Sequence, residues 1–134
     1  MSATAYHLNL GLAWLWIVFG IGSGCLLGLR FHQESWLGGY GSLRRRLYRL
    51  GHISFFGLAL LNLVFYFTAR ELDLGWWPGT IGSWGFALGA VTMPLCCLVM
   101  AHWPKWHLLF AVPVSSLAAA ALATCWALAD RLTL

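Results

Sequence analysis

The stretch LNLGLAWLWIVFGIGSGCLLGL (residues 8–29) contains no Asp, Glu, Lys or Arg side chain. A helix needs about 20 apolar residues to cross the hydrocarbon core of a bilayer, so this stretch is long enough for one membrane span. Three further stretches without a charged side chain follow it, at residues 50–68, 80–101 and 108–129. Their apolar residues run continuously rather than alternating, which favours helices over strands.

The overall composition agrees with a membrane protein. Hydrophobic residues make up 60% of the 134 residues and charged residues 9%, whereas soluble domains contain about 45–50% and about 25%. This balance argues against an ordinary cytosolic enzyme, a nucleic-acid-binding module and a secreted disulfide scaffold. We therefore predict an all-α integral membrane protein. Its single domain, residues 1–134, would be a bundle of four antiparallel transmembrane helices.

Basic residues are distributed unevenly between the loops. Arg70 and Arg131 lie at one end of the predicted spans, beside acidic residues. The other six basic residues lie in the first and third loops, and they are Arg30, Arg44, Arg45, Arg46, Arg49 and Lys105. Because cytoplasmic loops carry an excess of Lys and Arg, we expect these two loops in the cytoplasm and both termini outside. The expected location is the cytoplasmic (inner) membrane of a bacterium, and no nucleic acid is expected as a partner.

Small residues recur at four-residue spacing in three of the predicted spans. The rows are Gly20, Gly24 and Gly28; Gly85 and Gly89; and Ala111, Ser115, Ala119, Ala123 and Ala127. Helices in lipid pack closely where side chains are small, so each row predicts a helix contact. The sequence leaves open whether a given row faces another helix of this chain or a second protein.

Polar groups and prolines inside the spans need hydrogen-bond partners. Asn62 is the strongly polar residue deep in a span, and we expect it to bond between helices, with contact to a quinone or a substrate as the alternative. Pro94 and Pro113 each lack a backbone donor. We expect the carbonyls freed near Ala90 and Leu109 to be satisfied by neighbouring side chains, with Thr92, Ser115 and Ser116 as the candidates.

Two features of the connections can also be predicted. Ser42 is a residue type that caps helix N-termini, so we expect a helix to begin near Leu43 and continue into the second span. Residues 76–79, Trp-Trp-Pro-Gly, predict a turn before the third helix, because proline and glycine commonly interrupt regular structure.

A group of His and Arg side chains suggests a cofactor site near the cytoplasmic boundary. In a helix, side chains three, four or seven positions apart share a face, as Arg45, Tyr48, Arg49 and His52 do. An imidazole can ligate haem iron, and arginines can pair with the propionates. One hypothesis is therefore a haem b site formed by His52, His102, His107, Arg45 and Arg49. Interfacial packing and hydrogen bonds to lipid phosphate are the alternative role for these side chains.

The sequence predicts no catalytic residue and no site for a free metal ion, so we do not expect an enzyme that acts alone. The expected function is that of a small accessory subunit in a larger, energy-transducing membrane complex, with the bilayer and other membrane subunits as partners. The alternative is an electron-transfer subunit that binds haem b or helps to form a quinone site. A small transporter or channel ranks third, because no carboxylate lies within a span.

Overall fold

The computed structural model describes residues 6–132, and the termini lie outside this part of the chain. The described residues form four long helices, α1 (His7–Arg30), α2 (Leu43–Leu72), α3 (Trp76–His102) and α4 (Ala111–Leu132). Two 3-10 helices lie in the connections, η2 (Trp36–Gly38) and η3 (Pro104–Phe110). Four helical segments are long and apolar enough to cross a membrane, the last of them running through η3 into α4. The prediction of an all-helical protein with four such segments is confirmed.

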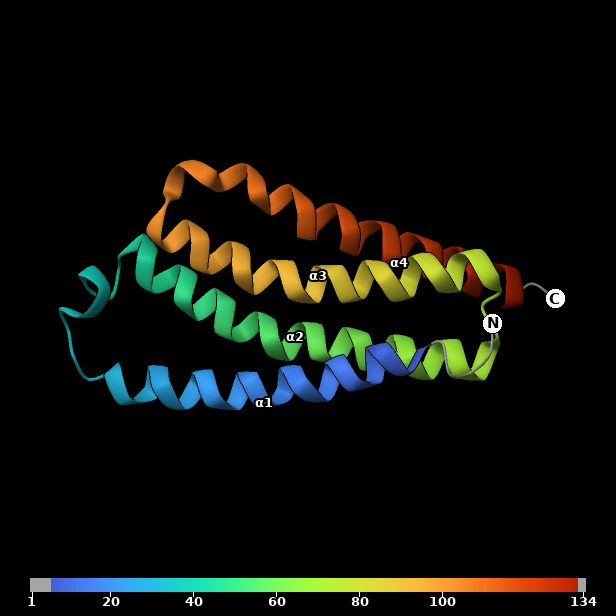
Figure 1. Cartoon of the computed structure of the whole chain (residues 1–134), viewed down its shortest axis with the longest axis horizontal. Helices are drawn as coiled ribbons and strands as arrows, with labels where there is room; N and C mark the ends of the chain where they lie inside the picture. Colours follow the sequence, from blue (N-terminus) through green and yellow to red (C-terminus); the bar gives the residue numbers. More distant parts are fainter. Residues whose placement is uncertain (1–5, 133–134) are drawn as a thin grey trace.

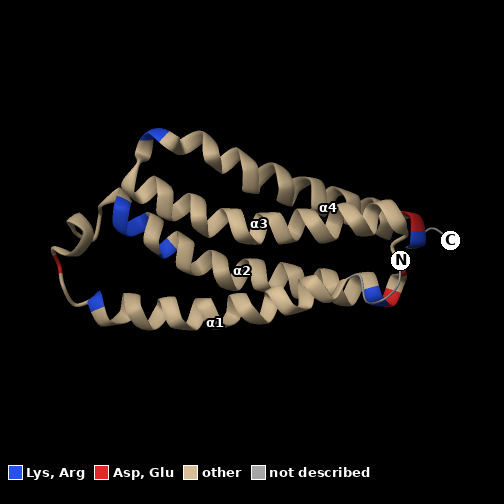
Figure 2. Cartoon of the chain, viewed as in Figure 1, with Lys and Arg blue, Asp and Glu red and all other residues tan. Residues whose placement is uncertain are grey.

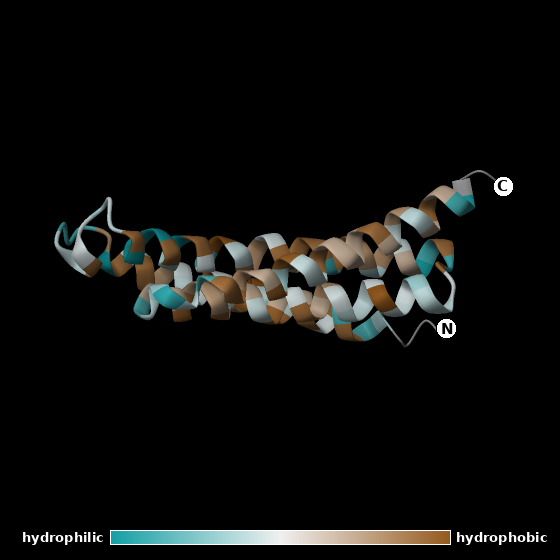
Figure 3. Ribbon diagram, turned by 90° about the horizontal axis from the view of Figure 1, so that it is seen from above, coloured by the Kyte–Doolittle hydropathy of each residue, from teal (hydrophilic) through white to brown (hydrophobic). Residues whose placement is uncertain are grey.

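The four helices pack side by side in chain order, each doubling back along the one before it (Figure 1). The contacts between α1 and α2, between α2 and α3 and between α3 and α4 are extensive, whereas α1 meets α3 and α2 meets α4 only locally. Helices α1 and α4 are therefore the two edges of a row. Apolar residues cover the helices along most of their length (Figure 3), and large ones such as Val18 and Leu122 are exposed. These surfaces suggest contact with lipid.

Helix α2 begins as predicted. Its first residue is Leu43, and the Ser42 hydroxyl oxygen accepts a hydrogen bond of 3.2 Å from the backbone N–H of Arg45. The same hydroxyl donates to the carbonyl of Leu37 over 2.7 Å. Ser42 therefore caps the helix and also fixes the preceding loop, where Gly38 adopts a positive φ of 86° that glycine tolerates.

The predicted turn at residues 76–79 is wrong, because these residues form the first turn of α3. The chain instead reverses just before them, where Asp73 and Gly75 have φ angles of 41° and 80°. Pro78 is compatible with this position, since the N–H groups of the first helical turn have no partner within the helix. The Pro-Gly pair therefore lies in the first turn of the helix, which begins at Trp76.

The carbonyls freed by the two prolines bond to other elements. The indole Nε1 of Trp16 in α1 donates to the carbonyl of Ala90, four residues before Pro94, over 2.9 Å. The thiol of Cys96 in α3 lies 3.3 Å from the carbonyl of Leu109, four residues before Pro113. The donors predicted for these carbonyls were wrong: Thr92, Ser115 and Ser116 bond to Leu88, Val112 and Pro113. Each of the two carbonyls thus accepts a hydrogen bond from a side chain of a different element.

The glycine rows of α1 and α3 face neighbouring helices of this chain. A Cβ atom at Gly85 would lie 2.8 Å from both Cβ of Ala120 and the carbonyl oxygen of Ser116 in α4. One at Gly89 would collide with Leu117 of the same helix. On α1, Cβ atoms at Gly20 and Gly24 would meet the rings of Phe56 and His52, whereas one at Gly28 would meet open space.

The small-residue row of α4 winds around its helix. Ala123 and Ala127 are buried, whereas Ala111, Ser115 and Ala119 are exposed. A step of four residues turns an α-helix by about 40° more than a full circle, so the four steps of this row cannot all stay on one interface. The buried face towards α3 instead includes Pro113 and Ala120.

Candidate functional site: a groove between α1 and α3

Three buried polar side chains connect α1, α2 and α3. The Nδ2 group of Asn9 donates to Oδ1 of Asn62 over 2.8 Å and to the carbonyl of Ser83 over 3.1 Å. The Ser83 hydroxyl donates to Oδ1 of Asn9 over 2.6 Å. The Nδ2 group of Asn62 donates to the carbonyls of Leu58 and Phe86 over 2.8 and 3.3 Å. Both N–H groups and the oxygen of the Asn62 amide therefore take part in bonds within and between helices.

The sequence interpretation missed Asn9 and Ser83 as members of this cluster. Both are as buried as Asn62, with exposed fractions of 0%, 3% and 1% respectively. Asn9 lies near the start of the first predicted span, where a polar residue can reach the headgroup layer. The sequence signal that could have found Asn9 is the presence of amide side chains in two different spans, because in hydrocarbon each amide can supply the hydrogen-bond partner that the other needs.

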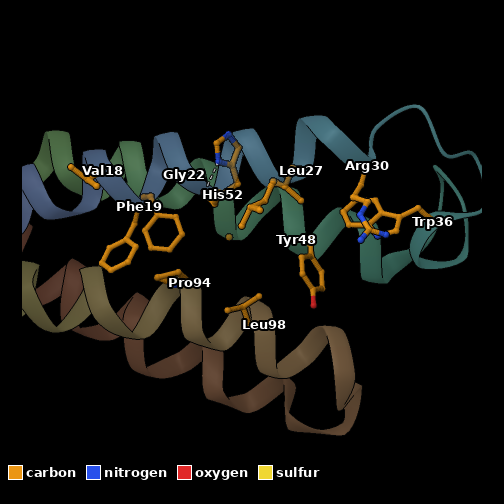
Figure 4. Close-up of a pocket in the computed structure, with 14 residues that line it drawn as sticks. Val18, Phe19, Gly22, Leu27, Arg30, Trp36, Tyr48, His52, Pro94 and Leu98 are labelled. Atoms are coloured by element: carbon orange, nitrogen blue, oxygen red, sulfur yellow. Dashed lines mark hydrogen bonds between the residues drawn. The ribbon is translucent and has the colours of Figure 1, made fainter.

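A groove of about 940 Å³ lies between α1 and α3, with α2 forming part of its lining. Figure 4 shows Phe19 of α1 and Pro94 and Leu98 of α3 around a common space. Most of the lining is apolar and includes Val18, Phe19, Leu26, Phe55, Pro94 and Leu98. Since each of these residues lies in a candidate membrane-spanning segment, the groove suits a hydrophobic molecule.

The groove also has polar side chains, which are concentrated towards its η2 end. Arg30 and Trp36 lie at that end, and Tyr48 lies between them and the apolar part (Figure 4). Ser23 and His52 contribute polar atoms from α1 and α2. The groove therefore combines an apolar lining with hydrogen-bonding groups and has one cation, Arg30, towards one end.

His52 is held between α1 and α2. Its Nδ1 atom lies 3.0 Å from the hydroxyl oxygen of Ser23. Its ring packs edge-to-face on Phe56, with centroids 5.6 Å apart, and occupies the space beside Gly24 that a larger residue would fill. A helix-to-helix hydrogen bond and the missing side chain of Gly24 together fix the orientation of the imidazole.

The other histidines of the haem hypothesis lie in different surroundings. The Nε2 atom of His102 is 3.0 Å from the hydroxyl of Tyr48, and the side chain is exposed. His107 is exposed on η3. The structure thus brings His102 to Tyr48 and directs His52 towards α1. Within residues 6–132, no group of three or more His, Cys, Asp or Glu side chains could hold a metal ion.

Arg45 is buried, with an exposed fraction of 2%. Its guanidinium donates to the carbonyls of Phe31 and Gln33 over 3.0 and 3.5 Å. It also lies 5.0 to 5.6 Å from the ring centroids of Phe31, Trp36 and Tyr40. Carbonyl oxygens and ring faces therefore surround this cation, and it ties the loop after α1 to the start of α2. In this conformation Arg45 is not available to a haem propionate.

Arg49 is the second arginine of the haem hypothesis. Its guanidinium lies 4.7 Å from the ring centroid of Tyr40, so it also packs on the loop after α1. The charged residues are distributed unevenly along the row (Figure 2). Six basic residues and one acidic residue, Glu34, lie at the end that holds η2 and the α3–α4 connection, whereas basic and acidic residues mix in similar numbers at the other end.

Comparison of this chain with protein families, with curated proteins and with solved structures gives no match. The groove and its lining are therefore the features from which a function can be inferred.

Proposed function

We propose that this chain is a small integral membrane protein that holds one amphipathic lipid molecule in the groove between α1 and α3. The carrying observation is the groove itself, which has an apolar lining along its length and polar groups towards one end. Its volume of about 940 Å³ lies within the range of about 300–1,000 Å³ that ligand sites have. The hydrocarbon tail would lie along Val18, Phe19 and Leu98, with the headgroup near Arg30.

We further propose that the four helices cross the membrane as antiparallel spans, with both termini outside. In this arrangement η2 and the connection through η3 face the cytoplasm of a bacterium. The basic residues gathered at that end support this orientation (Figure 2). The polar end of the groove would then lie at the cytoplasmic headgroup layer, where a lipid headgroup belongs.

The proposed role in the membrane is that of an accessory subunit in a larger, energy-transducing complex. The row of helices is open, so α1 and α4 each present an outer face. On α4 the exposed residues Ala111, Ser115 and Ala119 would let a helix of another subunit approach closely. Replacing Ala119 with Phe should release the chain from its complex in mild detergent, whereas Ala121→Phe, also at an exposed position, should not. Migration of the unaltered protein as a single chain would argue against this role.

Two glycines of α1 provide a matched test of lipid binding. Gly22 lines the groove, and a Cβ atom there would meet open space, so Phe at this position should fill the groove without displacing the backbone. Gly11 is equally open but lies outside the groove lining. We expect mass spectrometry of the purified proteins to find one retained lipid in the unaltered protein and in Gly11→Phe, and little in Gly22→Phe. Equal lipid content in all three proteins would contradict the proposal.

A further inference from the structure

We propose that the lipid in the groove is an anionic phospholipid, whose phosphate accepts hydrogen bonds from Arg30 and Trp36. This inference rests on the proposed function and names the class of lipid that the groove selects. It follows from the donors at the η2 end of the groove, from the buried charge of Arg45 next to Trp36, and from the basic residues around that end.

The polar side chains at the η2 end of the groove can donate hydrogen bonds but cannot accept them. Arg30 of α1 and Trp36 of η2 both line the groove, and both lie at this end (Figure 4). A guanidinium has five N–H groups and an indole has one, and neither has an acceptor atom. The hydroxyl of Tyr48, farther along the lining, lies 3.0 Å from Nε2 of His102 and already has a partner. A headgroup at Arg30 and Trp36 therefore needs acceptor oxygens, which a phosphate supplies.

Arg45 adds a permanent positive charge next to this end of the groove. Its guanidinium is buried and lies 5.6 Å from the ring centroid of Trp36. The carbonyls and ring faces around it are uncharged, and its Nε atom has no hydrogen-bond partner within residues 6–132. A buried cation is costly unless an anion compensates it. A phosphate at Trp36 would compensate part of this charge, because an indole and apolar surroundings screen charge far less than water does.

The charge around this end of the groove disfavours a zwitterionic headgroup. Six basic residues lie there, and Glu34 is the one acidic residue at this end among residues 6–132. Glu34 is exposed and lies outside the groove lining, and none of the described residues of that lining is Asp or Glu. The ammonium of a zwitterionic phospholipid would bring a positive charge into a positive field. A headgroup with a net negative charge is instead attracted, as it is in other basic pockets between membrane helices.

The test compares two phospholipids that have the same acyl chains. The purified protein in mild detergent is mixed with equal amounts of phosphatidylglycerol, which is anionic, and phosphatidylcholine, which is zwitterionic. Native mass spectrometry then measures which lipid the protein retains. We expect phosphatidylglycerol to be retained about tenfold more often, because the choline ammonium cancels the negative charge that the basic residues attract.

Two arginines provide a matched comparison of the groove with the surface around it. Arg30 and Arg46 are both exposed at the basic end, but Arg30 lines the groove and Arg46 does not. Arg30→Gln should lose most of the preference for phosphatidylglycerol, whereas Arg46→Gln, which removes the same charge, should keep it. An equal effect of the two substitutions would overturn the inference, because the preference would then come from the surface charge as a whole.

Trp36→Phe provides a second readout if Arg30→Gln fails to fold. This substitution keeps an aromatic ring beside Arg45 and removes the N–H group, so it should also weaken the preference for phosphatidylglycerol. An unchanged preference in Trp36→Phe would contradict the proposed bond from the indole to the phosphate.

The glycine variants separate this inference from the proposed function. Gly22→Phe should retain neither phospholipid, and Gly11→Phe should behave as the unaltered protein. If the unaltered protein retains both phospholipids equally and Gly22→Phe retains neither, the inference fails and the proposed function stands. Retention of an uncharged lipid in place of either phospholipid, lost in Gly22→Phe, has the same consequence. If Gly22→Phe retains as much of every lipid as the unaltered protein, both proposals fail.

Discussion

The side-chain amide of Asn9 donates a 2.8 Å hydrogen bond to the side-chain oxygen of Asn62, joining α1 to α2. Ser83 of α3 closes the cluster by donating to Asn9. Apolar side chains gain little free energy by leaving lipid for one another, so directional bonds of this kind help to determine which helices associate. The cluster therefore fixes the register of three helices near the end of the row where α1 begins.

The Asn cluster predicts a coupled loss of stability. Asn62→Leu should lower the free energy of unfolding by about 0.6–2 kcal/mol, the range for interhelical hydrogen bonds in membranes. Asn9→Leu should cost a similar amount. Because the two residues share bonds, the double variant should lose less than the sum of the single losses. Reversible unfolding in mixed micelles, followed by circular dichroism, measures each value, and strictly additive losses would contradict the coupling.

The bond from Trp16 to the carbonyl of Ala90 predicts that one substitution, Pro94→Ala, reduces the loss of stability caused by another, Trp16→Phe. Trp16→Phe keeps an aromatic ring but leaves this carbonyl without its 2.9 Å donor, so the free energy of unfolding should fall by about 1 kcal/mol. Pro94→Ala restores the backbone N–H that can donate to Ala90. In the Pro94→Ala background, Trp16→Phe should therefore cost less. The same unfolding measurement compares the two backgrounds, and an unchanged cost would show that Trp16 acts through packing alone.

The sequence predicts the helices of this protein better than their contacts. Length and the absence of charge reveal the spans, and Ser42 reveals where α2 begins, because these features depend on neighbouring residues. The partners of Asn62 and the Trp16 bond depend on how three helices are placed. The groove is even harder to predict from the sequence. Val18, Phe55 and Leu98 each resemble ordinary lipid-facing residues, and they lie on three different helices, so no periodic spacing in the sequence links them.

The small-residue rows show the same limit. A four-residue step predicts a shared face, yet the row of α4 is exposed from Ala111 to Ala119 and becomes buried only at Ala123 and Ala127. Helix geometry explains this, since the true period is about 3.6 residues. The glycines of α1 and α3 identify close approaches, but the sequence alone does not say that these approaches lie within one chain.

The contact of Gly85 with α4 predicts a steric effect. A Cβ atom there would lie 2.8 Å from the backbone carbonyl oxygen of Ser116, which cannot move as a flexible side chain would. Gly85→Ala should therefore separate α3 from α4 and lower the free energy of unfolding by about 1–3 kcal/mol. Gly57→Ala in α2 is the matched control, because its Cβ atom would meet open space. Equal stability of the two variants would show that α4 shifts to accept the methyl group.

The phenol of Tyr6 predicts a dependence of stability on pH. Its hydroxyl is buried without a hydrogen-bond partner within the described residues. Burial raises the pKa of Tyr6 above its usual 10.0, and the charge of Asp73 raises it further. The unfolded chain therefore releases the proton first. The stability that this shift contributes is complete below pH 10.0 and is lost as the pH rises through the higher pKa of the folded state.

Tyr6→Phe should remove this alkaline loss. Because the hydroxyl has no partner to lose, the variant should unfold at neutral pH with a free energy equal to that of the unaltered protein or up to about 1 kcal/mol higher. Unfolding in mixed micelles between pH 7 and pH 11 compares the two proteins, with Tyr40→Phe as a control for an exposed tyrosine. If Tyr6→Phe loses stability above pH 10 as steeply as the unaltered protein, another group causes the decline, and the buried phenol has no part in it.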